Sequence, residues 1–318
     1  MADFVAAHYG LPGPIECRLL RRGFNDTFEV RAENGQRLIL RLSGRRARGE
    51  SDVASESAFI AYLDKEGVPV AAPVPARDGA LFAVAVLPEG RRPAVLFKYA
   101  EGRAPQANSA ADARAHGVTL AQIHEAAERF VAGGCDRYRL DLDHLLHHPM
   151  SAVLSLASLS EDTRSGLAAL AKRLSSAVAA RSGLSWTRCH GDCHGHNARI
   201  AVEGPRVGQA AFFDFDDGGP GYLAYDLAVF LWARVSFQRK EHAMWHAFIE
   251  GYRSTRSLGE ADFEAARLFV PIRHVWLMGE YASRLAEWGV EAVPAEWVAR
   301  ELEFMQTWES TQIGPALL

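Results

Sequence analysis

The stretch Cys189-His190-Gly191-Asp192-Cys193-His194-Gly195-His196-Asn197 decides how this sequence is interpreted. It places an amide, Asn197, five positions after a carboxylate, Asp192, and a second carboxylate, Asp214, follows 22 residues after the first. Phosphoryl transfer needs a carboxylate that accepts a hydroxyl proton and oxygen ligands that hold Mg²⁺ against the phosphates. The spacing therefore predicts Asp192 as the base, and Asn197 and Asp214 as ligands of Mg²⁺, a hard cation that prefers oxygen.

The residues after the loop are typical of a β-hairpin. Residues 199–203 and 209–215 are rich in apolar side chains, and Gly204, Pro205 and Gly208 lie between them. The first strand would leave the loop at Asn197, and the second would deliver Asp214. Because a hairpin returns the chain alongside itself, both side chains are expected to reach one ion.

Three motifs together resemble the aminoglycoside phosphotransferase and choline kinase superfamily of protein-kinase-like enzymes. They are His190-Gly191-Asp192-x-x-x-x-Asn197, Phe213-Asp214-Phe215 and Tyr225-Asp226-Leu227-Ala228. The protein-kinase catalytic loop spaces its base and its metal-binding Asn in the same way. The variants Cys193-His194 and Asp216-Asp217 are most similar to a bacterial branch of stress-response Ser/Thr kinases and homoserine-kinase-like phosphotransferases.

The resemblance implies an α+β, bilobal protein-kinase-like fold with an antiparallel-sheet N-lobe and a mainly helical C-lobe. Residues 1–104 would form the nucleotide-binding lobe and end in a hinge. Residues 105–318 would form the helical lobe, with the catalytic loop and the substrate site. The implied cofactors are ATP and Mg²⁺.

A zinc site is the alternative interpretation of the loop, because Cys189, His190, Cys193, His194 and His196 crowd into eight residues. Structural zinc sites usually pair two such clusters, separated by a longer loop. The remaining cysteines, Cys17 and Cys135, stand alone. Zinc would also leave the two aspartates and the asparagine unexplained, so the cysteines are expected to pack as small apolar groups.

Composition narrows the class of protein further. The 318 residues are 48% hydrophobic and 23% charged, which is typical of a globular protein with room for two cores. A formal net charge of −4 gives no indication of a nucleic-acid partner. Four cysteines without paired spacing favour a cytoplasmic setting, and neither a signal peptide nor an apolar run long enough for a membrane helix is recognised.

Nucleotide-binding residues are assigned in the first half by position in the resembled family. Strands are expected at 15–20, 28–31 and 37–42, and the turn with Gly23 and Asn25 would cover the nucleotide. An ordinary hairpin turn is the alternative, because the family's other glycines are missing. Asn34-Gly35 predicts a tight turn in which both residues accept positive φ.

By the same resemblance, Arg41 would contact the ATP phosphates and pair with Glu56 on a helix that begins near Ser51. A surface arginine and a solvated glutamate are the alternatives. Two further strands, 81–87 and 94–99, lead to the hinge. There, backbone groups near Phe97 and Tyr99 would bind the adenine ring.

The second half is predicted to be helical at 110–130, 150–158, 161–182, 222–235 and from 240 onward, with a turn at 218–221. His190 would brace the loop, Asp226 would accept hydrogen bonds from its backbone, and Asp216, which replaces a glycine of protein kinases, would line the site. Arg273, Glu280, Arg284 and Glu287 lie among aromatic residues. Acids there could recognise a cationic substrate, or these residues could form surface pairs along a helix.

The function that these motifs favour is transfer of the γ-phosphate of ATP to a hydroxyl of a small molecule, such as an amino alcohol, a homoserine-like metabolite or an aminoglycoside. Only seven residues separate Asp214 from Tyr222, whereas protein kinases commonly place a longer peptide-docking segment there. A Ser/Thr protein kinase of the stress-response type is the alternative, and a non-catalytic nucleotide-binding protein is a third.

Overall fold

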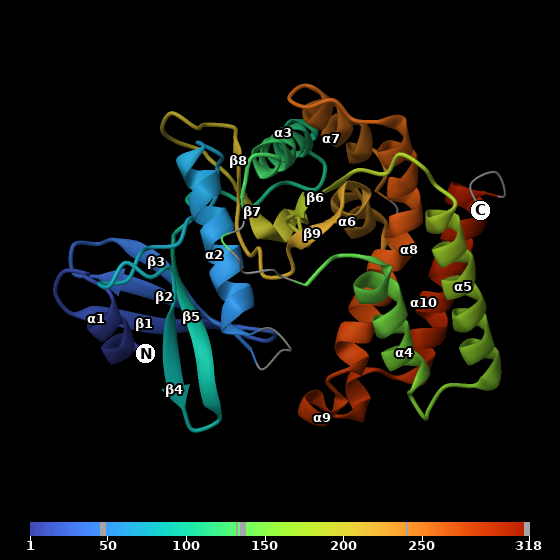
Figure 1. Ribbon diagram of the computed structural model, residues 1–318, viewed down its shortest axis with the longest axis horizontal. Coiled ribbons are helices and arrows are strands. Elements are labelled where there is room, and N and C mark those ends of the chain that lie inside the picture. Colours follow the sequence, from blue (N-terminus) through green and yellow to red (C-terminus); the bar gives the residue numbers. More distant parts are fainter. Residues whose placement is uncertain (45–48, 132, 134–137, 240, 315–318) are drawn as a thin grey trace.

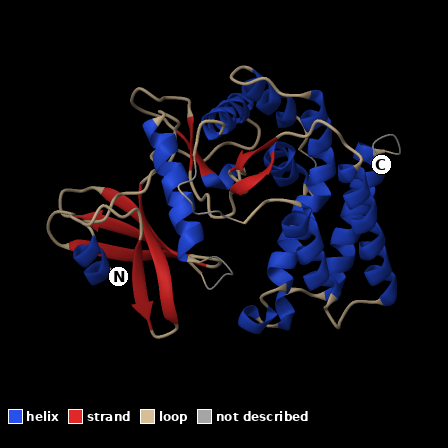
Figure 2. Cartoon of the chain, in the orientation of Figure 1, coloured by secondary structure: helices blue, strands red, loops and turns tan. Residues whose placement is uncertain are grey.

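The computed structural model describes residues 1–44, 49–131, 133, 138–239 and 241–314, and Cys135 lies outside them. A sheet-rich half is followed along the chain by a mainly helical half (Figures 1 and 2). The sheet half consists of α1 (Ala2–His8), β1 (Ile15–Arg22), β2 (Asp26–Ala32), β3 (Arg37–Leu42), α2 (Glu50–Lys65), β4 (Ala83–Leu87) and β5 (Gly90–Lys98). Its strands form one antiparallel sheet in the order β1-β2-β3-β5-β4.

Alternation along β3 gives the sheet two different faces. Leu38 and Leu40 are buried in an apolar cluster that also contains Val5 of α1. Arg41 points to the other face, where it meets α2. The preceding hairpin turn differs from the prediction, because only Gly35 of the Asn34-Gly35 pair has positive φ, at 81°.

The helical half contains most of the remaining secondary structure. Its elements are α3 (Ala110–Ala127), α4 (His148–Leu154), α5 (Glu161–Ala179), β6 (Trp186–Cys189), β7 (Ala198–Ile200), β8 (Ala210–Phe212), β9 (Gly219–Tyr222), α6 (Leu223–Val235), α7 (Met244–Arg253), α8 (Glu260–Ala282), α9 (Leu285–Trp288) and α10 (Ala295–Trp308), with single turns at Asp143–His147, Gly195–Asn197, Val290–Ala292 and Glu309–Ile313. No helix in the described ranges combines the length and the apolar character needed to cross a membrane. The predicted helices are present, whereas the boundary at 104/105 stays a prediction.

The predicted turn at 218–221 is wrong in one respect, because Gly219–Tyr222 forms β9 and pairs antiparallel with β6. Glycine is required there by close approach rather than by a reversal of the chain. A Cβ atom on Gly218 would lie 2.7 Å from the carbonyl oxygen of Cys189. The strand pairing therefore holds the segment after Asp217 against the residues that enter the catalytic loop.

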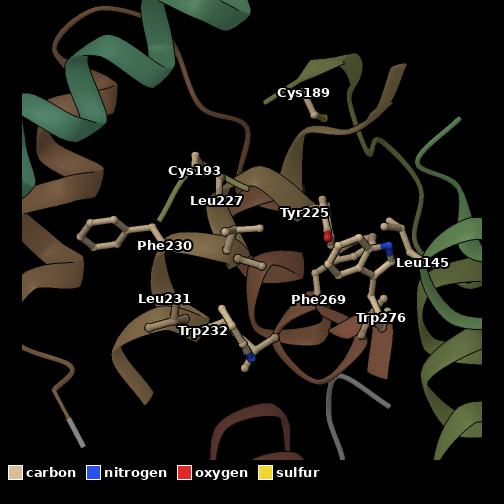
Figure 3. Packing of buried hydrophobic residues seen from close by; sticks show 14 of the residues in the cluster. Leu145, Cys189, Cys193, Tyr225, Leu227, Phe230, Leu231, Trp232, Phe269 and Trp276 are labelled. Atoms are coloured by element: carbon tan, nitrogen blue, oxygen red, sulfur yellow. The ribbon is translucent and has the colours of Figure 1, made fainter. Parts of the chain in front are cut away.

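Backbone hydrogen bonds join the two halves around the hairpin of β7 and β8. Ala71, in the connector after α2, donates to Phe212 at 2.9 Å, and Arg103 and Ile200 exchange bonds of 2.8 and 3.0 Å. Phe59 and Phe97 of the sheet half belong to the same apolar cluster as the helical core. Figure 3 shows part of that cluster, including side chains of α6 and α8. The hairpin thus has a fixed place against the sheet half.

Two glycines allow α3 and α7 to pack closely. A Cβ atom on Gly117 would lie 2.0 Å from the carbonyl oxygen of Phe248, and one on Gly251 would lie 2.1 Å from that of Arg114. Both obstacles are backbone atoms of a neighbouring helix, which move only if the helices separate.

We expect Gly251→Ala to lower the free energy of unfolding by about 1–3 kcal/mol, the usual effect of overpacking. The cost of overpacking against a backbone atom is expected to exceed the gain of about 1 kcal/mol that alanine brings to a helix interior. Urea denaturation would measure the change. Gly10→Ala is the control, since its Cβ would meet nothing within 4 Å. A Gly251→Ala protein as stable as the wild type would contradict the close packing.

Candidate active site

Asp192 and Asn197 are held together by the loop that contains them. The Nδ2 atom of Asn197 donates to the backbone oxygen and to Oδ2 of Asp192, both at 2.9 Å. The β7–β8 hairpin follows as predicted, and Phe213 donates its N–H to the carbonyl of Asn197 at 3.1 Å. Asp214 lies two residues beyond the end of β8, where its φ of 66° turns the chain back toward the loop.

Asp226, which is fully buried, holds the backbone of the loop. Its two oxygens accept the N–H groups of His190 at 2.6 Å and Gly191 at 2.7 Å. A nitrogen of His124 lies 3.0 Å away. The ring of His190 in turn contacts the carbonyl of Phe213 at 3.1 Å, so loop and hairpin are braced together.

The structure brings Arg41 and Glu56 together, as the resemblance implies. Two hydrogen bonds of 2.7 and 2.6 Å join guanidinium and carboxylate, and both side chains are buried. The alternatives of a surface arginine and a solvated glutamate are therefore wrong. Burial opposes the charge on Arg41, but Glu56 outweighs it, so the pKa of the guanidinium is raised. The pair lies next to the loop, since Nη1 of Arg41 is 3.5 Å from Oδ1 of Asp214.

Several carboxylates lie around Asp214, where the site faces the cavity. Removal from bulk water, followed by the charge of Asp216, raises the pKa of Asp214, and Asp217 and Asp192 add to the effect while Arg41 opposes it. The side chain of Asp214 is nevertheless 40% exposed, because it faces an open cavity. A divalent cation there would relieve the repulsion, and carboxylate and amide oxygens are suitable ligands.

Asp216 forms a link to the sheet half that the sequence did not predict. Its Oδ2 atom accepts a hydrogen bond of 2.7 Å from Nδ2 of Asn25, whose Oδ1 accepts the N–H of Gly44 at 3.0 Å. Asn25 and Asp216 both line the cavity, whereas Gly23 does not belong to its lining. The turn expected to cover a nucleotide is thus tied to the acidic segment through Asn25.

The cavity between the two halves has a volume of about 520 Å³. Its lining combines residues of the sheet half, including the expected hinge, with the loop, the hairpin end and several aromatic residues of the helical half. These residues include Phe97, Lys98, Tyr99, Ala100, Arg41, Asp192, His194, Asn197, Asp214, Asp216, Asp217, Phe24, Trp232, Phe237, Arg273, Trp276 and Tyr281. The sites predicted for a nucleotide, a metal ion and a base therefore share one space.

Arg273 is the main residue whose contact with the site the sequence did not predict. A helix-surface position is wrong for it, because Arg273 is buried and its Nη2 atom donates to Oδ1 of Asp192 at 2.6 Å. Glu280 and Arg284 form the expected pair along the helix, 3.6 Å apart, but it is largely covered rather than on the surface, with side chains 22% and 10% exposed. Within the described part of the chain, the acids that line the cavity all come from 192–217, so Glu280 and Glu287 do not belong to its lining.

The loop cysteines are packed as the sequence predicts. Both thiols are buried, and they donate to the carbonyls of Tyr222 at 3.4 Å and Asp226 at 3.0 Å. Burial raises the pKa of Cys189 and of Cys193, which disfavours the thiolate that zinc requires.

Comparison with known proteins places the chain among phosphotransferases. A family model described as "Phosphotransferase enzyme family" matches residues 16–269. An uncharacterised protein of Deinococcus radiodurans is 40% identical, over 97% of this chain and 89% of its own. A homoserine kinase of Caulobacter vibrioides is 27% identical (88% and 84% covered), and a stress response kinase A of Salmonella choleraesuis is 25% identical (87% and 80% covered).

Solved structures show the same fold at low sequence identity. A microcompartment-associated aminopropanol kinase superposes with a TM-score of 0.81, at 23% identity over 100% of this chain and 99% of that one. An amicoumacin kinase in complex with AMP-PNP, Ca²⁺ and Ami gives a TM-score of 0.78, at 19% identity over 98% of this chain and 93% of that one. The predicted protein-kinase-like fold is confirmed.

We expect Asp226→Asn to lower the free energy of unfolding by about 2–3 kcal/mol, because one buried charge-assisted hydrogen bond to the loop is lost. Chemical denaturation would measure the loss, and kcat should fall with it as the loop loosens. Asp143→Asn, an exposed change whose partner is His147, serves as the control. Equal stability of Asp226→Asn and the wild type would refute the supporting role.

Proposed function

The chain belongs to the phosphotransferase enzyme family, and from this premise we propose that it transfers the γ-phosphate of ATP to a hydroxyl of a small molecule. The observation that carries the proposal is the meeting of Asp192, Asn197 and Asp214 in one cavity beside the Arg41–Glu56 pair. A phosphoryl-transfer site needs a base, oxygen ligands for a metal ion and a cation for the phosphates, and this cavity offers all of them.

Asn197 and Asp214 would hold Mg²⁺. Nδ2 of Asn197 is occupied by Asp192, which leaves its Oδ1 for a metal ion. The acids around Asp214 disfavour its ionised form unless a cation joins them. When bound, Mg²⁺ neutralises charge on the phosphates of the nucleotide.

The nucleotide would lie between the sheet half and the loop. Arg41 is held rigidly by Glu56 and has the charge to bind phosphate oxygens. Backbone groups of Phe97 to Tyr99 at the edge of the cavity would meet the adenine ring. Asn25, tied to Asp216 and Gly44, would keep the turn at 23–25 over the phosphates.

Asp192 would orient the acceptor hydroxyl and take its proton. Its side chain is 15% exposed, toward the cavity. Each carboxylate oxygen can accept more than one hydrogen bond, so both keep acceptor capacity beside the donors already present. Orientation of the hydroxyl supplies most of the effect in this chemistry, because the transition state of phosphoryl transfer requires little covalent assistance.

A small acceptor is favoured by the segment after Asp214. The chain enters β9 at Gly219, and β9 pairs with β6 along its whole length. This leaves little chain in which a peptide could dock. Homoserine, aminopropanol and amicoumacin kinases are also named for small acceptors. The similarity to a stress response kinase supports a Ser/Thr protein substrate as the second candidate.

An ATP-consumption screen tests the proposal. The purified protein with Mg·ATP would be offered aminopropanol, homoserine, choline, an aminoglycoside and casein, with Asp192→Ala as the control for contaminating kinases. We expect a small alcohol to give the largest Asp192-dependent turnover. Phosphorylation of casein alone would support the second candidate. Turnover that Asp192→Ala retains in full would overturn the assigned chemistry.

For Asp192→Asn we expect kcat to fall by about 10²–10⁴, the usual contribution of a positioned general base. Mg·ATP binding should remain unchanged, since no predicted nucleotide contact is lost. Steady-state kinetics and calorimetry would separate the two effects. A variant that loses nucleotide affinity instead would place Asp192 in binding rather than in turnover.

For Asp214→Ala we expect the affinity for Mg·ATP to fall by at least about tenfold, equivalent to about 1.4 kcal/mol. Titration calorimetry with and without EDTA would measure it. In EDTA, the variant and the wild type should bind ATP alike, because the loss acts through the metal ion. The same Mg·ATP affinity in both proteins would remove Asp214 from the metal site.

A further inference from the structure

Arg273 lies in the middle of α8, far along the chain from the catalytic loop, yet it contacts the loop directly. Its side chain is 3% exposed, and Nη2 donates to Oδ1 of Asp192 at 2.6 Å. One turn before Arg273 on α8, Phe269 and Val270 are apolar and buried, and Trp276 follows one turn after it. A guanidinium here interrupts an apolar stretch of that helix face.

Two tryptophans hold the guanidinium in place. The central carbon of Arg273 lies 4.3 Å from the ring centre of Trp276, three residues further along α8, and 4.8 Å from that of Trp232 on α6. Both rings line the cavity and belong to the buried cluster shown in Figure 3. A planar guanidinium can pack against aromatic faces and still donate hydrogen bonds at its edge.

Burying the charge of Arg273 costs free energy, and packing alone does not explain why a charged residue stands at this position. Removal from water opposes the charge on Arg273, but Tyr225 and Asp192 outweigh it, so the pKa of the guanidinium is raised and the group stays charged. A buried ion pair contributes little net stability compared with apolar side chains of the same volume. Leucine or methionine would fill the space between the tryptophans at less cost. The arginine is therefore better explained by what it does to Asp192.

We propose that Arg273 is a positioning residue, which fixes the carboxylate of Asp192 in the orientation that receives the acceptor hydroxyl. This inference rests on the proposed function. Arg273 donates to Oδ1, while Asn197 donates to Oδ2 at 2.9 Å. Two donors on different oxygens, one from α8 and one from the loop, fix the rotation of the carboxylate plane. Without Arg273, the loop would contact Oδ2 alone, through Asn197 and through His194 at 3.4 Å, and the carboxylate plane could turn about one bond.

The kinetic test compares Arg273→Met, which keeps length and apolar packing, with Arg273→Lys, which keeps the charge. The acceptor is the one with the highest turnover in the screen. We expect Arg273→Met to lower kcat by about 100-fold, the effect of misplacing a reacting group by about 1 Å. The KM for ATP should not change, and Arg273→Lys should recover part of kcat. Arg267→Met, the same change on α8 at a residue stacked on Phe263 outside the cavity, should match the wild type.

A purely structural role would give a different result. In that case both variants would lose stability and nucleotide affinity together, and lysine would rescue neither. That outcome, or a kcat of Arg273→Met equal to that of the wild type, would overturn the positioning role. If the methionine variant does not fold, Arg273→Lys decides between the two roles. A lower kcat with an unchanged KM for ATP supports positioning, and a loss of nucleotide affinity supports a structural role.

A second measurement requires no turnover and so separates failure of this inference from failure of the proposed function. Crystal structures of the wild type and of Arg273→Met would show the rotamer of Asp192. We expect one rotamer bonded to Arg273 in the wild type, and a rotated or divided carboxylate in the variant over an unchanged loop backbone. An Asp192 that keeps its rotamer without Arg273 would refute positioning, whether or not any acceptor is phosphorylated.

Discussion

Four aspartate carboxylates face one cavity, and their mutual repulsion is the constraint on which the rest of the site depends. The pKa of Asp214 is raised by its surroundings, with Asp216 the strongest of the neighbouring charges. Arg41 approaches Asp214 from the sheet half, and Arg273 approaches Asp192 from α8. The two arginines thus offset the repulsion from different halves of the molecule, and residues of both halves line the cavity.

Beneath the exposed acids, a buried one provides rigidity. Asp226 meets backbone N–H groups, His124 and no bulk water, whereas Asp192 and Asp214 face the cavity. A buried carboxylate is stable when donors satisfy it, and those donors then have only one arrangement. The loop backbone is thus held by a residue that does not line the cavity. The side chains that would meet a ligand are instead contacted by Arg41, Asn25 and Arg273.

Sequence predicted the local parts of the site, and the family resemblance added the Arg41–Glu56 pair, but the contact of Arg273 was missed. The spacing of Asp192 and Asn197 lies within one loop, and the β7–β8 hairpin follows from its own turn residues. The contact of Arg273 with Asp192 spans 81 residues. Helical periodicity can show that position 273 falls within an apolar helix, but not which partner a buried charge there meets. The charge itself was the available signal, because arginine is rarely buried without a partner.

The wrong prediction of a turn at 218–221 shows how support of the loop is connected to the kind of acceptor that the site would admit. Glycine and proline there predicted a turn, yet the pairing of β9 with β6 overrides local preference. The lack of a side chain on Gly218 lets the chain just before β9 approach the carbonyl of Cys189. A longer docking segment would have to be inserted before that strand, where Gly218 lies against the carbonyl of Cys189. It would then disturb a contact with the residues that enter the loop. The short connection after Asp214 therefore holds the loop that carries the proposed base, and it also leaves little chain for the docking that a peptide substrate would need.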